Sequence, residues 1–366
     1  MKEHILVVGG YGHVGKMICS QLGELYPGRV IAAGRSLDRA KQYCRTTGGK
    51  VKPLQLNVYE PCDPQLLEQI RVVVMCLDQN ENHFVKSCLL SGTHYIDISA
   101  SYAFLQQVEK LHDAAKENGV SGLLSVGLAP GLTNLMALQA IELMDDAQQI
   151  DITIMLGIGD EHGQAAIEWT VQSLSSSFSV TQGGIPHAVT SFSDGKRVDF
   201  GGAIGTKTAY RFNFSDQHIL PKTLGIPTVS TRLCFDSEVL TRGIAAARSV
   251  GLLKLFTNKW MEQIMVHSMG RVSFGKADFA VKVDGYGIKD GKPAVVECFL
   301  RGKHEACMTA QTAVFAAQKA YEEAFAHGVY HIEQLIRPNA IQSIINNLAD
   351  YEVRRDSHSQ MIHLPL

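Results

Sequence analysis

The 366-residue sequence has no apolar stretch of 18 residues, so we expect no transmembrane helix. Its first apolar run stops at Gly9-Gly10 after four residues, which predicts that there is no signal peptide. The net charge of −2 provides no global field that would attract nucleic acid or an anionic membrane. These absences predict an ordinary globular protein, and the cysteine usage described next predicts that it is cytoplasmic.

Cysteine pairs at metal-ligand or redox spacing are also missing. None of the eight cysteines belongs to a C-x-x-C motif, and several lie inside apolar stretches. This usage is typical of buried thiols in a reducing compartment and does not favour disulfides or zinc. His304-Glu305 has no second pair of ligands at metal spacing, so we predict no metal site.

The start of the chain carries a strong pattern. Residues 5–8 are apolar, as in a buried strand, and Gly10, Gly12 and Gly15 then form G-x-G-x-x-G before an apolar helical repeat. Strand, glycine-rich turn and helix in this order are the context of a dinucleotide-binding site. The glycines allow a tight turn, a close approach to the pyrophosphate and close helix packing, and the first helical amides face the phosphates. The alternative is a plain structural turn.

The end of the second predicted strand, residues 30–33, indicates which dinucleotide binds. NAD-dependent enzymes usually place Asp or Glu there to hold the ribose 2′-hydroxyl, whereas this chain has Gly34-Arg35-Ser36. The Arg35 guanidinium can bind a 2′-phosphate, and the Ser36 hydroxyl can add a donor. We therefore predict NADP in preference to NAD. The alternative is that Arg35 is a solvated loop residue and that Ser36 caps the next helix.

Residues 1–126 alternate strand and helix six times, which predicts a doubly wound α/β domain of the Rossmann type. The last predicted helix of this region is 102–118, and the last strand is 123–126. Ligands of such sheets bind beyond the carboxyl ends of the strands. The predicted cofactor-binding residues lie at those ends: Gly10, Tyr11, Gly12, His13, Val14, Gly15, Gly34, Arg35, Ser36, Asn57, Val58, Cys76, Leu77, Pro130 and Gly131.

The pattern changes near residue 150. Residues 150–158 alternate strictly between apolar and other residues, and a hairpin is predicted over 277–300, so the middle region reads as an α+β domain. An alanine-rich helix, 309–327, ends at Gly328, and we expect it to return to the first domain. The predicted domains are residues 1–130 for cofactor binding, residues 131–307 as an inserted substrate and dimerisation domain, and residues 308–366 as the returning helices.

Four segments together resemble the saccharopine dehydrogenase superfamily: residues 10–15, residues 34–36, G-T-H-Y-I-D-I-S at 92–99 and the G-x-x-P-G loop within 127–134. The resemblance covers nearly the whole chain. It implies a Rossmann domain with an inserted substrate domain, a small-molecule substrate, and NAD(P)-linked oxidoreductase chemistry of the EC 1.5.1 type at a C–N bond of an amino acid or imine conjugate. Saccharopine reductases tend to have Asp before the Pro-Gly of the loop, where this chain has Ala129, so no single amino acid is implied as the substrate.

Reducing an imine requires one proton on nitrogen, and the carboxylate of an amino-acid substrate usually pairs with Arg or Lys. Asp97 follows the fifth strand and can bind an amine or relay a proton, or it can simply brace its loop. The predicted catalytic residues are Asp97, Lys207 and Tyr210, and the predicted substrate-binding residues are Ser99, Asn134, Glu168 and Arg211. Helix capping or a solvated charge is the structural alternative for these polar residues.

Two other functions stay open at this point. One is an enoyl reductase that acts on carrier-bound or lipid substrates, and the other is a non-catalytic protein that binds NADP. We also expect a homodimer, both from the family resemblance and because an open edge of the middle sheet is usually covered.

Overall fold

The computed structural model describes residues 2–253, 263, 275–323 and 325–355. The chain divides into two compact units. Unit 1 comprises Met1–Leu132 and Ala306–Ile336, and unit 2 comprises Thr133–Glu305 and Arg337–Leu366. None of the described helices is long and apolar enough to cross a membrane.

Unit 1 is built on a seven-stranded sheet in the order β15-β6-β5-β4-β1-β2-β3, and every pair of neighbours is parallel. Its central strands are apolar because both faces are covered, and residues 5–8 and 72–75 have no exposed surface. The strands are β1 (His4–Val8), β2 (Val30–Gly34), β3 (Val51–Gln55), β4 (Ile70–Met75), β5 (His94–Asp97), β6 (Ser121–Leu124) and β15 (Gly328–His331).

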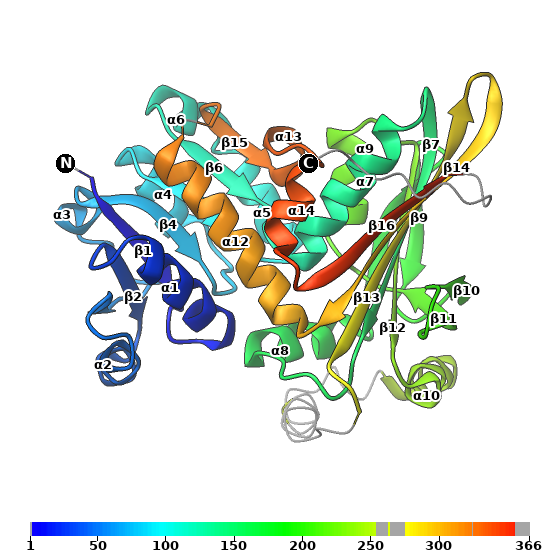
Figure 1. Ribbon diagram of the computed structural model, residues 1–366, viewed down its shortest axis with the longest axis horizontal. Helices are drawn as coiled ribbons and strands as arrows, with labels where there is room; N and C mark the ends of the chain where they lie inside the picture. The colour runs from blue at the N-terminus through cyan, green and yellow to red at the C-terminus, as the bar shows by residue number, and fades with distance from the viewer. Residues whose placement is uncertain (1, 254–262, 264–274, 324, 356–366) are drawn as a thin grey trace. The chain divides into compact units, whose positions relative to one another are not determined.

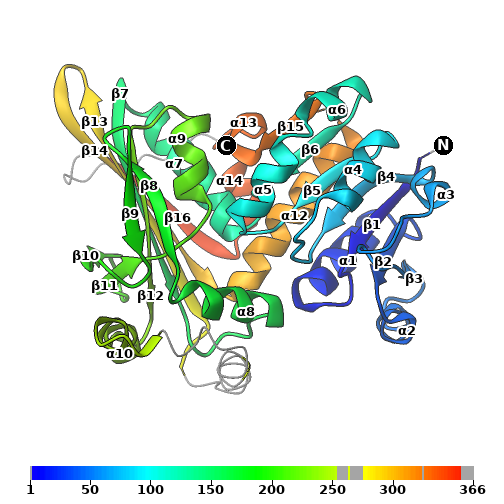
Figure 2. The ribbon, with the colours of Figure 1, turned by 180° about the vertical axis from the view of Figure 1, so that it is seen from behind.

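Helices cover both faces of this sheet, which confirms the predicted doubly wound α/β architecture. Helices α1 and α12 lie on the face seen in Figure 1, and α4 and α5 lie on the face seen in Figure 2. The helices are α1 (His13–Leu25), α2 (Leu37–Arg45), α3 (Pro64–Leu67), α4 (His83–Leu90), α5 (Tyr102–Glu109), α6 (His112–Glu117), α12 (Glu305–Glu322) and α13 (Ile332–Leu335).

Several boundaries in unit 1 differ from the prediction. The helix predicted over 102–118 is two helices, α5 and α6, and β6 begins two residues earlier than expected. The helix predicted over 309–327 ends at Glu322, and Gly328 is the first residue of β15 instead of a helix cap. The amide of Gly328 donates to the carbonyl of Val120, so the returning segment continues the parallel ladder beside β6.

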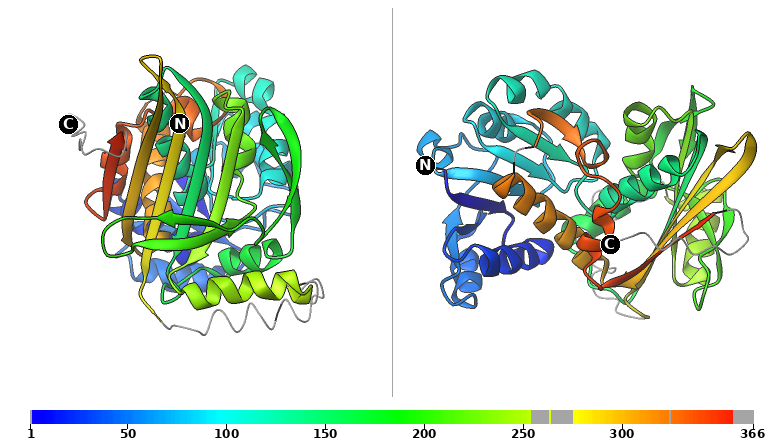
Figure 3. Two further views of the ribbon diagram at one scale, coloured as in Figure 1. Left: turned by 90° about the vertical axis from the view of Figure 1, so that its right-hand side faces the viewer. Right: turned by 45° about the horizontal axis from the view of Figure 1, so that its top comes forward.

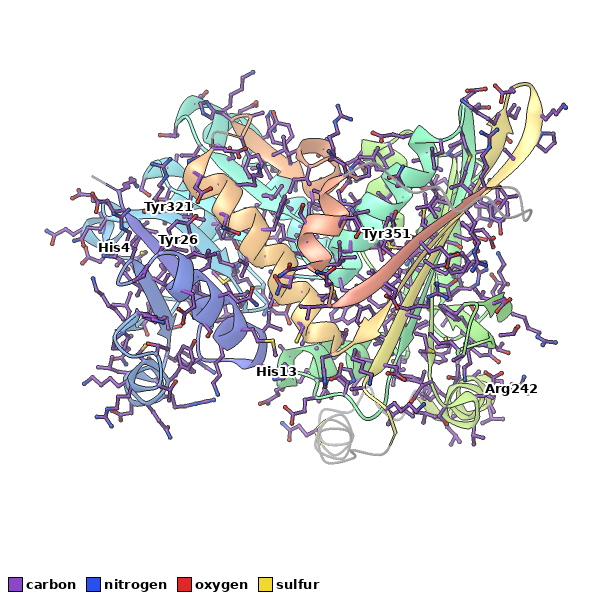
Figure 4. All side chains as sticks on the ribbon, viewed as in Figure 1. His4, His13, Tyr26, Arg242, Tyr321 and Tyr351 are labelled. Carbon is purple, nitrogen blue, oxygen red and sulfur yellow. The ribbon has the colours of Figure 1, made fainter. Side chains whose placement is uncertain are left out.

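The contact of α12 with unit 1 is visible in Figure 4, where Tyr26 and Tyr321 are labelled close together. Their ring centroids lie 4.6 Å apart, and the Arg29 guanidinium donates to the Tyr321 hydroxyl at 2.9 Å. The Tyr26 hydroxyl also donates to the Glu322 carboxylate. These contacts join residues almost 300 positions apart, so the first domain is completed only by the late part of the chain.

Unit 2 has its own seven-stranded mixed sheet, in the order β10-β11-β12-β7-β13-β14-β16, and a separate β8-β9 pair (Figure 3). The segment predicted as a strand over 150–158 is β7, which ends at Leu156. Its alternating isoleucines are buried, but so are Asp151, Thr153 and Met155, so both faces of the strand are covered and the two different faces that the pattern predicted are not observed. The strands are β7 (Asp146–Leu156), β8 (Ser177–Gln182), β9 (Ile185–Thr190), β10 (Lys196–Asp199), β11 (Thr206–Arg211), β12 (Thr228–Phe235), β13 (Asp278–Lys289), β14 (Lys292–Lys303) and β16 (Ala349–Arg355).

Helices α7 and α9 pack against this sheet, α7 on β7, β13 and β14, and α9 on β12. The predicted hairpin is confirmed by the antiparallel pairing of β13 with β14. The described helices of unit 2 include α7 (Thr133–Glu142), α8 (Gln164–Ser173), α9 (Asp216–Thr223), α10 (Glu238–Ser249) and α14 (Ala340–Ile345).

The C-terminal part of the chain does not return to the first domain as a whole. Residues 306–336 belong to unit 1, but residues from Arg337 onward belong to unit 2. The physical reason is β16, which pairs antiparallel with β14 from Ala349 to Arg355 and extends the second sheet. The expectation that 308–366 forms one returning segment is therefore wrong for this last stretch.

Candidate functional site

The glycine-rich turn forms a tight cradle between β1 and α1. The Gly12 amide donates to the Gly9 carbonyl at 2.8 Å, and α1 begins at the next residue without a side-chain cap on its first amides. A Cβ built on Gly15 would lie 2.1 Å from the Gly9 carbonyl oxygen, and one on Gly10 would lie 2.8 Å from the Cα of Ala32. The sequence motif thus has the geometry of an anion-binding helix start.

The loop between β2 and α2 is held by Tyr11 from the glycine-rich turn. The Ser36 amide donates to the Tyr11 hydroxyl at 2.9 Å, and a Cβ on Gly34 would lie 2.5 Å from that hydroxyl. The Ser36 side chain accepts from the Arg39 amide and caps α2, so its capping alternative is realised. Arg35 is exposed, and the Arg39 guanidinium lies 5.2 Å from the centre of the Tyr11 ring.

Arg39 is a second cation at this loop that the sequence analysis did not single out. It lies on the first turn of α2, and its guanidinium lies over the ring of Tyr11 from the glycine-rich turn. Arg35 precedes the helix, so no helical spacing in the sequence relates the two arginines.

The strand ends next to the turn carry the other predicted cofactor residues. The Asn57 side chain donates to the Glu60 carboxylate at 2.7 Å, and Val58 is buried. The Leu77 side chain lies so close to Gly9 that a Cβ built on this glycine would be 2.9 Å from Leu77 Cδ2. The Cys76 amide donates to the Val8 carbonyl, and burial raises the pKa of its thiol. Cys76 is therefore a neutral thiol beside the turn.

Asp97 lies at the carboxyl end of β5 and is completely buried. Its carboxylate accepts from the Tyr95 hydroxyl and, at 2.7 Å, from the Ser99 amide. Gln79 in turn donates to the Tyr95 hydroxyl at 2.8 Å. The Ser99 hydroxyl accepts from the Ser101 amide, so Asp97 and Ser99 both brace the loop after β5.

Burial raises the pKa of Asp97 to about 7, because the charged form loses its hydration, although the Tyr95 hydroxyl and the Ser99 amide both favour the carboxylate. A carboxyl group with this pKa can hold or release a proton near neutral pH. The bond from the Ser99 amide shows that Asp97 also braces the loop after β5, which is the structural alternative that the sequence left open.

The loop that follows β6, residues 127–132, is packed against the rest of unit 1. The Leu128 amide donates to the Thr309 hydroxyl at 3.2 Å, and the Leu132 amide donates to the Gly127 carbonyl at 2.9 Å. Pro130 and Gly131 are buried, and Gly131 has φ of 140°, a conformation that only glycine adopts readily. The glycine is therefore required by the backbone conformation itself.

The predicted residues Lys207, Tyr210 and Glu168 each contact another residue of unit 2. Lys207 donates to the Asp236 carbonyl at 2.8 Å, and the Tyr210 ring stacks on Phe192 with centroids 5.9 Å apart. Glu168 accepts from Gln164 on the same helix. Asn134, the second residue of α7, is completely buried.

Arg211 has a more unusual environment. Its Nε donates to Asp194 at 3.0 Å, and Arg232 donates to the same carboxylate oxygen at 2.6 Å. Burial and the neighbouring Arg232 charge lower the pKa of Arg211. Within the described part of the chain, Nη1 of Arg211 is buried and has no hydrogen-bond partner. A buried guanidinium with an unused donor is suited to a further anionic group.

No group of three metal-ligating side chains is found among the described residues. All eight cysteines are free thiols.

One family model and several solved structures are similar to this chain. Residues 5–123 match the family model described as the saccharopine dehydrogenase NADP binding domain. The fold is similar to that of apo saccharopine dehydrogenase (L-Glu forming) from Saccharomyces cerevisiae, with a TM-score of 0.66 and 13% identity over 97% of this chain and 100% of that chain. DAP dehydrogenase from C. glutamicum, solved with DAP, covers 92% of this chain and 95% of its own, with 12% identity and a TM-score of 0.46. A comparison with curated protein sequences found no match.

We predict that Asp97→Asn flattens the pH dependence of stability. The carboxyl group has a pKa near 3.8 when unfolded and about 7 when folded, so the folded protein binds more protons between these values. The free energy of unfolding contributed by Asp97 therefore falls as the pH rises from about 4 to about 7. Relative to the parent protein, the asparagine variant should gain stability over this range, by up to ~4 kcal/mol at 1.36 kcal/mol per pH unit.

Chemical denaturation at a series of pH values measures this difference. Glu117→Gln, which removes an exposed carboxylate from α6, serves as the control and should leave the pH dependence unchanged. Parallel stability curves for the parent and Asp97→Asn would show that the buried carboxyl does not titrate in this range.

Proposed function

We propose that the protein is an NADP-dependent oxidoreductase acting at a C–N bond of an amino acid or imine conjugate, because residues 5–123 match the saccharopine dehydrogenase NADP binding domain. The observation that carries the proposal is the match of this domain together with its built glycine cradle. NADPH supplies the hydride in this chemistry, and the protein supplies binding, orientation and a proton.

The residues of unit 1 fit the cofactor. The approach of Gly15 to Gly9 leaves no room for a side chain at the start of α1, and the first amides of that helix have no side-chain cap. These amides are suited to the pyrophosphate. Arg35 and Arg39 are exposed on the adjacent loop and helix, where a 2′-phosphate would be recognised. Tyr11 links the two subsites through its bond to the Ser36 amide.

We expect NADPH to bind at least tenfold more tightly than NADH, a difference of about 1.4 kcal/mol. The reason is that Arg35 stands where a carboxylate would favour NAD, with Arg39 as a second cation. Arg35→Ala should weaken NADPH binding and leave NADH binding nearly unchanged, and Arg39→Ala should do the same to a smaller extent. Titration calorimetry measures both affinities.

Arg45→Ala is the matched control, because Arg45 is an exposed arginine in the last turn of the same helix. It should not alter either affinity. Equal affinity for the two cofactors in the parent protein, or a preference for NADH, would contradict the assignment of NADP.

For the substrate we extend the proposal to unit 2. Arg211 is assigned to a substrate carboxylate, since its buried Nη1 has an unused donor among the described residues. Ser99, Asn134 and Glu168 are retained as further polar contacts of the substrate. Asp97, Lys207 and Tyr210 are retained as the acid–base candidates, with Asp97 acting from behind the loop that it braces.

The experiment that tests this function is a screen of NADPH oxidation against pairs of an amino acid and a 2-oxo acid or aldehyde. We expect at least one pair to be turned over, and Arg211→Ala to raise the KM for that pair by ~10-fold or more, the scale of one charge-assisted hydrogen bond. Arg197→Ala, an exposed arginine on β10, is the control and should leave KM unchanged.

If no pair is turned over and an enoyl substrate oxidises NADPH instead, the enzyme acts at a C=C bond and not at a C–N bond. Tight NADPH binding without any turnover would leave a cofactor-binding protein that is not an enzyme.

We also propose that the protein is a homodimer. The second sheet ends at β10 and at β16, and among the described strands β10 is paired only with β11 and β16 only with β14. Open edges of this kind are usually covered. Light scattering should therefore give about twice the chain mass of 40.0 kDa at micromolar concentration. A mass near that of one chain would contradict the dimer.

A further inference from the structure

We infer that Glu109, His331 and Ser125 form a proton path from the surface to the carboxyl end of β6. The inference rests on the proposed function, because the reduction of an imine consumes one proton for each hydride. None of these three residues was singled out by the sequence analysis. They come from α5, from the last residue of β15 and from the residue after β6.

The three side chains form a continuous hydrogen-bonded chain. The Ser125 Oγ lies 2.8 Å from His331 Nδ1, and His331 Nε2 lies 3.0 Å from a carboxylate oxygen of Glu109. The arrangement depends on the parallel register of β15 with β6, in which His331 is the partner of Leu124. Figure 2 shows α5 and β15 beside β6. The path therefore crosses the last two strands of the sheet.

The exposed fraction of the side chains falls along this path from Glu109 to Ser125. The Glu109 side chain is 33% exposed and that of His331 is 4% exposed, whereas Ser125 has no exposed surface. One end can exchange protons with water and the other cannot. The buried end lies at the carboxyl edge of a parallel sheet, directly before the glycine-containing loop 127–132, which is where open α/β sheets bind their ligands.

Ser125 has a backbone conformation that is unusual for a residue other than glycine. Its φ is 59°, in the left-handed region, which residues with a side chain rarely adopt. Glycine would adopt this backbone without strain. Strained positions of this kind cluster at functional sites.

The two ring nitrogens of His331 allow the imidazole to release a proton at one atom while it takes up another at the other atom. With an imine and NADPH bound, the Ser125 hydroxyl would give its proton to the substrate nitrogen and NADPH would supply the hydride to the C=N carbon, so that C=N becomes CH–NH. To replace that proton, the Glu109 carboxylate would take one from water and pass it to His331 Nε2, and His331 Nδ1 would pass its own proton to Ser125 Oγ. Rotation of the imidazole ring would then restore the starting tautomer.

A purely structural role for the same contacts is the alternative, because they also fasten β15 to β6. His112 offers a matched control, since it also contacts β15 but is not part of the hydrogen-bonded path from Glu109 to Ser125. Its Nδ1 accepts from the Val329 amide at 3.2 Å, and its ring fills the space beside Gly328. Loss of His112 should weaken β15 without interrupting proton transfer.

The test uses the full chain, NADPH and the amino acid and oxo acid pair that the parent protein turns over. Glu109→Gln keeps a hydrogen-bond acceptor without a titratable proton, and Ser125→Gly removes the hydroxyl but suits the backbone. Each should lower kcat by ~10-fold or more, with KM and the Kd of NADPH within about twofold. The solvent deuterium isotope effect on kcat should rise in both, and added formate should restore part of the rate of Glu109→Ala.

His112→Gln should lower the melting temperature and leave kcat and the isotope effect unchanged. If Glu109→Gln and Ser125→Gly keep kcat within twofold of the parent, or lose it only as the melting temperature falls, the contacts are structural and the path is refuted while the proposed function stands. If the parent protein turns over no pair at all, the proposed function fails and the proton path falls with it.

Discussion

The close packing of the first turn of α1 on the Gly9 carbonyl is the constraint on which unit 1 depends. No side chain can stand at Gly15, because even its Cβ would lie 2.1 Å from that oxygen. The same carbonyl accepts from the Gly12 amide, and the Gly9 amide donates to Ala33 of β2. One short segment thus fixes β1, the turn, the helix start and the neighbouring strand, and the anion-binding amides follow from it.

A second consequence of the parallel sheet is that polar side chains gather at one edge and must find partners there. Asp97 after β5 is satisfied by Tyr95 and by the Ser99 amide, and Ser125 after β6 is satisfied by His331. Asp97 and Ser125 are both buried, so their hydrogen-bond partners determine which atom carries the shared proton. The loop 127–132 begins two residues after Ser125, and the Val126 amide donates to the Asp97 carbonyl at 3.2 Å, so the ends of β5 and β6 are joined at this edge.

Local patterns were sufficient to predict the glycine cradle, the existence of β7 and the β13–β14 hairpin, because each depends on neighbours in the sequence. The partners of β15 and β16 lie far away along the chain, at β6 and within the second sheet, and no short pattern encodes such pairing. The hydrogen bonds from Ser125 through His331 to Glu109 follow from the same distant pairing of β15 with β6.

We propose that NADPH binds along the carboxyl edge of the unit 1 sheet. Hydrogen exchange of the backbone amides, measured by mass spectrometry with and without NADPH, tests this binding. NADPH should slow exchange in three segments, residues 9–16, residues 34–39 and residues 125–132, with the β8–β9 pair unchanged as an internal reference. Protection that is absent from the first two segments, or that appears only in unit 2, would contradict it.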